Sequence, residues 1–182
     1  RGLGDVYKRQ VSSMGSHVSV VPNHQLNRKT PLHTRANVAY FGTFGYELDL
    51  NKLSDEEISE VKQQITFMKE YRELIQFGTF YRLKSPFEGN ETVWMTVSED
   101  KKTALVFWYR ERNVVNADFT RVRLQGLDPD LIYRNEYNET ENYGDELMNL
   151  GLLTTDCTAG EPTSEDEPCT DYESRIYVLT AK

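Results

Sequence analysis

Three polar residues near the start of the chain have side chains that could hold a ligand by hydrogen bonds. His17 lies within a short apolar segment, and Asn23 and His24 follow Pro22 just after it. Imidazole and amide groups donate and accept hydrogen bonds, so these residues could orient a hydroxyl group or support a nearby carboxylate. A structural alternative stays open, in which His17 is a core histidine with satisfied hydrogen bonds and Asn23 and His24 cap the following helix.

A pair of carboxylates occurs further along the chain, at Glu47 and Asp49. Residues two apart on a strand share one face, and two neighbouring carboxylates can serve acid–base or nucleophilic catalysis. The sequence Asp49-Leu-Asn51, however, is typical of a strand end that leads into a helix cap. We therefore expect a structural role for Asp49 and assign no catalytic function to the pair.

Four aromatic residues lie in or beside two apolar segments that we expect to form a hairpin: Trp94, Phe107, Trp108 and Tyr109. Their rings could form a platform on which the apolar face of a sugar stacks. Aromatic residues on a hairpin more often fill the core between two packed sheets. The core interpretation is therefore the one that we expect to hold.

Both cysteines, Cys157 and Cys169, lie in an acidic loop at 154–173. This loop contains seven acids and no Lys or Arg, while the whole chain of 182 residues has a net charge of −8, so the remainder is close to neutral. Two thiols with no histidine nearby do not make a four-ligand zinc site, and we expect no metal. Free thiols in a reducing cytoplasm fit this pattern better than a disulfide. The negative net charge argues against nucleic acid as a partner.

No segment of the sequence has the length and composition of a membrane span. The longest apolar run, Ala104 to Tyr109, has six residues, whereas a membrane-spanning helix needs about 18 or more. No secretory apolar region follows the N-terminus. We therefore expect a cytoplasmic protein with no membrane partner.

The first ten residues, Arg-Gly-Leu-Gly-Asp-Val-Tyr-Lys-Arg-Gln, look foreign to the rest of the chain. Their back-translation matches the end of a common transposon sequencing adapter over all ten codons. We therefore expect residues 1–10 to be non-native and the native chain to begin near Val11, cut from a longer protein.

The first half of the native chain has the pattern of alternating strands and helices. We expect strands at 14–21 and 44–50. A first helix should cover 32–41, with Thr30 as its N-cap and Pro31 as its first residue. A second should begin at a capping box formed by Ser54 and Glu57 and end at Gly78. Helices between strands imply a parallel sheet.

The pattern changes beyond Gly78. Alternating apolar residues predict a hairpin of 93–97 with 104–109, and further strands at 119–125, 131–133 and 175–179. No helical period of useful length follows Gly78. Residues 79–182 are therefore expected to form an all-β antiparallel sandwich, and residues 11–78 the end of an α/β domain.

Several long motifs occur in a fixed order along the chain. The first half contains Met14-Gly-Ser-His-Val-Ser19, Pro22-Asn-His-Gln25, Thr30-Pro-Leu32 and Gly42-Thr-Phe-Gly-Tyr-Glu-Leu-Asp-Leu50. The second contains Arg72-Glu-Leu-Ile-Gln-Phe-Gly78, Ser85-Pro-Phe-Glu-Gly-Asn-Glu91, Gly126-Leu-Asp-Pro129 and Gly144-Asp-Glu-Leu-Met148. Together they resemble the C-terminal part of bacterial α-galactosidases of glycoside hydrolase family 36. Arg110-Glu-Arg112 and the long acidic loop depart from the family pattern.

The resemblance implies that residues 11–78 are an α/β remnant, the last two βα units of a TIM barrel, followed by the sandwich. Family members are retaining hydrolases that release terminal α-linked galactose from oligosaccharides such as melibiose and raffinose. Both catalytic aspartates lie upstream of Met14 in the family, so this chain should contain no catalytic residue and be inactive alone. His17, Asn23 and His24 would lie near the mouth of the site as substrate-binding residues. No cofactor is implied, and the whole protein should be a homo-oligomer.

One alternative belongs to a different class of function. The β-rich half could be a free-standing, non-catalytic β-sandwich that binds carbohydrate or another subunit. Such a module would need aromatic side chains exposed on its surface, which separates this alternative from the first interpretation.

Overall fold

The computed structural model describes residues 11–24, 27–112, 114, 119–154 and 171–182. The predictions for residues 1–10 and for Cys157 and Cys169 with most of the acidic loop therefore lie outside the described residues. The chain divides into two compact units, Arg1–Phe77 and Gly78–Lys182. Each unit is described by itself.

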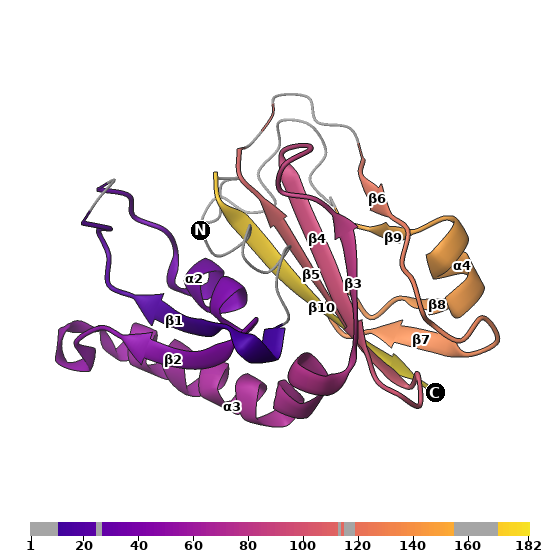
Figure 1. Ribbon diagram of the computed structural model, residues 1–182, viewed down its shortest axis with the longest axis horizontal. Helices are drawn as coiled ribbons and strands as arrows, with labels where there is room; N and C mark the ends of the chain where they lie inside the picture. The colour runs from indigo at the N-terminus through magenta and orange to yellow at the C-terminus, as the bar shows by residue number, and fades with distance from the viewer. Residues whose placement is uncertain (1–10, 25–26, 113, 115–118, 155–170) are drawn as a thin grey trace. The chain divides into compact units, whose positions relative to one another are not determined.

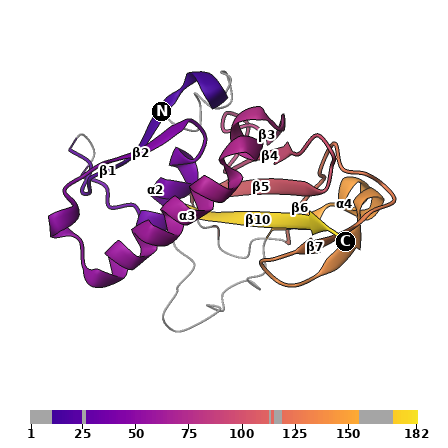
Figure 2. The ribbon, with the colours of Figure 1, turned by 90° about the horizontal axis from the view of Figure 1, so that it is seen from below.

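The first unit is a short α/β segment, as predicted. Its elements are, in order, η1 (Val11–Ser13), β1 (Gly15–Ser19), α2 (Leu32–Ala39), β2 (Thr43–Glu47), η2 (Leu50–Lys52) and α3 (Asp55–Phe77). The two strands are parallel, with Gly15 opposite Thr43 and Ser19 opposite Glu47. Both strands lie along α3 (Figures 1 and 2).

The starts of the two helices differ in how well the sequence predicts them. The capping box is confirmed, because the backbone N–H of Glu57 donates to Ser54 Oγ over 3.2 Å and that of Ser54 donates to Glu57 Oε2 over 2.9 Å. The prediction of Thr30 as an N-cap is wrong. Pro31 is the N-cap of α2 and has extended ψ of 149°. The guanidinium of Arg35 reaches back from the helix to bind the Thr30 carbonyl.

One face of the β1–β2 pair is packed against the helices. Val18 on β1 is fully buried, and Tyr46 lies opposite Val18 on β2. The Tyr46 hydroxyl donates to Gln64 Oε1 of α3 over 2.8 Å. The ring of Phe44, on the same face as Tyr46, stacks 5.0 Å from that of Tyr40. Because side chains alternate along a strand, the odd-numbered residues of both strands lie on the opposite face.

The second unit is built on an antiparallel sheet of six strands in the order β3-β4-β5-β10-β7-β8. These strands are β3 (Thr79–Lys84), β4 (Glu91–Val97), β5 (Thr103–Arg110), β7 (Ile132–Asn135), β8 (Glu141–Tyr143) and β10 (Glu173–Ala181). A separate pair joins β6 (Arg121–Val122) to β9 (Leu152–Leu153), and a short helix, α4 (Gly144–Asn149), lies between β8 and β9 in the chain. The hairpin and the antiparallel arrangement are confirmed.

Several details of the second unit were not predicted, among them the strands β3, β8 and β9. The sequence shows no helical period of useful length after Gly78, and α4 was not predicted because its six residues are too few to show one. The expected strand at 119–125 is reduced to the two residues of β6. The rest of that segment packs Leu124 and Leu127 into the core as irregular chain.

A single apolar core joins the six-stranded sheet to the layer formed by β6, β9 and α4. Every other residue of β4 and β5 enters this core, together with apolar residues of β10, α4 and the segments around β6 and β9. Its buried members are Val93, Met95, Val97, Ala104, Val106, Trp108, Val122, Leu124, Leu127, Tyr133, Leu147, Leu152, Tyr177 and Leu179. The sheet and this second layer together make the packed β-rich domain that the sequence predicts.

Candidate functional site

The face of β1 and β2 that the helices leave open carries a contact between a histidine and a carboxylate. His17 and Glu47 both lie on this odd-numbered face, because His17 is opposite Gly45 and Ser19 is opposite Glu47 in the register. His17 Nε2 lies 2.6 Å from Glu47 Oε2, and the two side chains are 52% and 73% exposed. Glu47 is the last residue of β2. The pair therefore joins the middle of β1 to the carboxyl end of β2.

The structural alternative for the three predicted ligand-binding residues does not hold. His17 is half exposed, so it is not a core histidine. Asn23 and His24 do not cap α2, since its N-cap is Pro31 and receives no side-chain cap hydrogen bond. The backbone N–H of Asn23 donates to the Arg28 carbonyl over 2.9 Å, closing the loop that follows β1.

The loop after β1 is attached to the start of α2 through Arg35. One guanidinium nitrogen donates to the carbonyl of Ser19, the last residue of β1, and Nε donates to that of Thr30 over 3.0 Å. Burial lowers the pKa of Arg35, while the charges of Glu57 and Glu60 act in the opposite direction. Arg35 thus ties both ends of the segment that contains Asn23 and His24.

Glu47 and Asp49 do not form a carboxylate pair with a shared role. The Asp49 carboxylate accepts from the backbone N–H and from Nδ2 of Asn51, each over 3.1 Å, and so caps η2. This confirms the predicted structural role of Asp49. The sequence interpretation considered Glu47 only together with Asp49 and missed that Glu47 is the partner of His17. Both residues lie on predicted parallel strands, which is a signal for proximity but does not give the register.

The aromatic residues considered as a sugar platform are buried. Trp94, Phe107, Trp108 and Tyr109 are each at most 3% exposed. Trp108 belongs to the core between the sheet and its second layer. The other three lie on the opposite face of the same sheet, where the rings of Trp94 and Tyr109 are 4.8 Å apart. The core interpretation is confirmed for Trp108, and no member of the group is available to stack on a ligand.

A charged cluster lies at the ends of β5 and β10, on the core side of the sheet. Arg110 and Arg175 both pair with the Glu173 carboxylate, the latter over 2.7 Å. Arg110 also lies over the ring of Trp108, with its guanidinium carbon 5.3 Å from the centroid. The guanidinium of Arg110 is thus nearly buried within this cluster.

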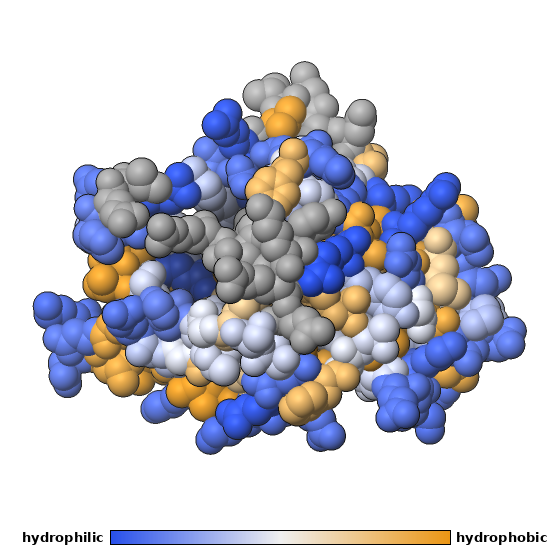
Figure 3. Space-filling view, viewed as in Figure 1, coloured by the Kyte–Doolittle hydropathy of each residue, from blue (hydrophilic) through white to orange (hydrophobic). Residues whose placement is uncertain are grey.

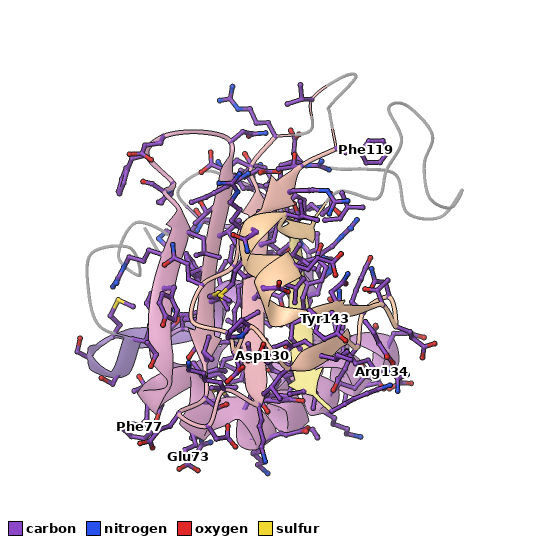
Figure 4. The ribbon with its side chains drawn as sticks, turned by 90° about the vertical axis from the view of Figure 1, so that its right-hand side faces the viewer. Glu73, Phe77, Phe119, Asp130, Arg134 and Tyr143 are labelled. Atoms are coloured by element: carbon purple, nitrogen blue, oxygen red, sulfur yellow. The ribbon has the colours of Figure 1, made fainter. Side chains whose placement is uncertain are left out.

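Tyr143 is an exposed aromatic residue of the second unit, with 53% of its surface exposed. It ends β8 and shares a face with Arg134 of β7, because Tyr143 pairs with Ile132 and Glu141 pairs with Arg134. Both side chains are shown in Figure 4. Arg134 binds Glu139 over 3.1 Å, and both side chains of that pair are exposed. In Figure 3 such polar residues are interspersed with scattered hydrophobic ones, the ordinary composition of a protein surface.

Two kinds of feature are absent from the described residues. In that part of the chain, no helix is long and apolar enough to cross a membrane. Nor do the same residues contain a group of three or more His, Cys, Asp or Glu side chains that could hold a metal ion.

Comparison with known protein families accounts for nearly the whole chain. The model of the glycosyl hydrolase family 36 C-terminal domain matches residues 91–179, and the melibiase model matches residues 4–78. The chain belongs to glycoside hydrolase family 36. Among its family 36 relatives, alpha-galactosidase AgaA of Geobacillus stearothermophilus is 51% identical over 142 residues, which are 78% of this chain and 19% of AgaA. Alpha-galactosidase Mel36A of Lactobacillus acidophilus is 47% identical over 141 residues, again 78% and 19%.

Solved structures of family 36 enzymes have the same fold over this region. The galactosidase domain of the alpha-galactosidase-sucrose kinase AgaSK superposes with a TM-score of 0.86 at 39% identity, covering 100% of this chain and 24% of that one. A variant of AgaA from G. stearothermophilus in complex with raffinose gives 0.84 at 44% identity, covering 95% and 22%. The chain thus spans about a fifth of the length of the curated relatives it matches.

Proposed function

We propose that the whole protein is a retaining α-galactosidase and that this chain supplies the last two βα units of its (β/α)8 barrel and its C-terminal β-sandwich. The observation that carries the proposal is the His17–Glu47 pair on the strand face that the helices leave open. In such barrels the helices cover the outside, and active sites form at the carboxyl ends of the strands. A polar pair on the inner face near those ends belongs to the substrate-binding side of the barrel.

The catalytic carboxylates of this proposed enzyme come from barrel strands outside the described chain. Retention of configuration needs two carboxyl groups about 5–5.5 Å apart, one as nucleophile and one as acid and base. Glu47 is engaged with His17 and Asp49 caps η2, so these two carboxylates have other roles. His17, Asn23 and His24 are the residues proposed to contact the sugar.

The proposed substrates are oligosaccharides that end in α-linked galactose, such as melibiose and raffinose. Structures of AgaA variants in complex with stachyose and with raffinose support this choice of sugar class. We further propose that the whole protein is cytoplasmic and homo-oligomeric and uses no cofactor, and that residues 1–10 are non-native. Sequencing unfragmented source DNA upstream of the Val11 codon tests the last point.

Two activity measurements test the proposed function. The chain alone should not hydrolyse an aryl α-galactoside. A chimera in which residues 14–152 replace the matching segment of the G. stearothermophilus enzyme should hydrolyse this substrate. NMR spectra recorded immediately after the reaction starts should show the released galactose as the α-anomer. The parent enzyme and a version without the segment are the controls. Turnover by the chain alone, or a folded chimera without activity, would contradict the proposal.

A further inference from the structure

The His17 ring is held by one of its two nitrogens. Nε2 lies 2.6 Å from Glu47 Oε2, and an ionised carboxylate only accepts hydrogen bonds. Nε2 must therefore carry the proton that forms this bond. In the neutral imidazole only one nitrogen is protonated, so Nδ1 is then an acceptor. In the described part of the chain, Glu47 is the polar partner seen for His17.

The strand face beside His17 is open over Gly45. The residue directly opposite His17 is Gly45, and a Cβ added at Gly45 would meet no atom within 4 Å. The ring can therefore lean diagonally toward Glu47 at the strand end without a side chain between them. The His17 side chain is 52% exposed, so a ligand can reach the ring.

The contribution of this pair to stability should be small. Both side chains are about half exposed or more, and exposed ion pairs add little because water and salt screen them. Proteins often orient a functional histidine in this way, with a carboxylate on one nitrogen and the working group on the other. The geometry therefore favours orientation of His17 over stabilisation of the fold.

We propose that Glu47 is a positioning residue. It fixes His17 with the proton on Nε2, so that Nδ1 accepts a hydrogen bond from a hydroxyl group of the bound galactosyl unit. This inference rests on the proposed function for the identity of the ligand. The orientation of His17 by Glu47 does not rest on it, and the two can be tested separately.

The first experiment measures the tautomer of each histidine in the chain itself. Long-range proton–nitrogen NMR correlations at about pH 9, where imidazole is neutral, distinguish Nε2–H from Nδ1–H. His24 and His33 are exposed and serve as internal references. His17 should be entirely the Nε2–H form, and Glu47→Gln should give it the tautomer mixture of the references. A His17 signal that does not change in Glu47→Gln, or that shows Nδ1–H in the unsubstituted chain, would overturn the inference.

The second experiment is a double-mutant cycle in the active chimera described above. Glu47→Gln should lower kcat/KM about tenfold, the effect of one lost hydrogen bond in the transition state. If Glu47 acts through His17, the variant that combines Glu47→Gln with His17→Ala should have the same kcat/KM as His17→Ala alone. An equal loss from Glu47→Gln with and without His17 would refute the positioning role. The exposed Glu139→Gln is a matched control that should change nothing.

The two experiments separate the inference from the proposed function. If the chimera folds but is inactive before any substitution is made, the proposed function is contradicted. The NMR measurement uses the chain without any enzymatic activity, so its result still decides whether Glu47 orients His17.

Discussion

Replacing Glu173 with Gln removes the only negative charge among the described groups that bind Arg110. Arg110 pairs with Glu173 Oε2, and Arg175 pairs with Glu173 Oε1 over 2.7 Å. The side chains of Arg110, Arg175 and Glu173 are 7%, 13% and 17% exposed. The Gln variant keeps the size of the side chain, so the change is almost purely one of charge. It leaves a guanidinium that is nearly buried beside the Trp108 ring.

The size of the effect follows from this burial. Removing one member of a buried ion pair costs about 3–5 kcal/mol, because the remaining charge stays out of water without its partner. All three groups are slightly exposed, and Arg175 also lies over the rings of Trp108 and Tyr137, so we place this case at the lower end, at about 3 kcal/mol. For a chain of this length, a loss of about 3 kcal/mol lowers Tm by about 6–12 °C.

Thermal and urea unfolding followed by circular dichroism measure this loss. The control is Glu139→Gln, which breaks the Arg134–Glu139 pair, whose side chains are 49% and 77% exposed. An exposed pair contributes less than about 1 kcal/mol. If Glu173→Gln lowers the stability no more than Glu139→Gln does, the cluster at the ends of β5 and β10 is not a buried charge network and the reasoning fails.

Three further substitutions test local features. Ser54→Ala removes half of the capping box and should cost about 1 kcal/mol, measured by urea unfolding; no loss would mean that the helix does not depend on its cap. Burial raises the pKa of Tyr46 to about 12, above its unfolded value of about 10. Stability should therefore fall as the pH rises from about 10 to about 12, and alkaline titration should show a smaller fall in Tyr46→Phe. Gly126→Ala should be strongly destabilising in thermal unfolding, because Gly126 has φ of +76° and its Cβ would lie 2.2 Å from Tyr81 Oη. The control Gly89→Ala, whose Cβ meets nothing within 4 Å, should have little effect.

Features that depend on neighbours in the chain were predictable from the sequence. The capping box at Ser54 and Glu57 and the three- and four-residue spacing after it define α3 within two residues at its start. Alternating apolar residues likewise locate the β4–β5 hairpin, whose strands are joined by a short turn. The short α4 and β8 were missed, because three to six residues are too few to show a period.

The candidate site depends on contacts between distant segments and was only half predictable. His17 was recognisable as a histidine within a predicted strand. Its partner Glu47 lies 30 residues away, and their proximity depends on the exact register of β1 and β2. A shift of one residue would turn Glu47 toward the helices, because side chains alternate along a strand. Sequence spacing instead drew attention to Asp49, whose carboxylate stays within its own turn.

The central position of β5 has a consequence for how the second unit exchanges its amide protons. β5 is hydrogen-bonded to β4 on one edge and to β10 on the other, and residues Ala104 to Arg110 are at most 7% exposed on both faces. No partial opening at a sheet edge frees these amides, so they exchange only when the whole unit unfolds. Deuterium uptake by β5 therefore reports the global stability of this unit, while uptake by the edge strand β8 reports local fraying.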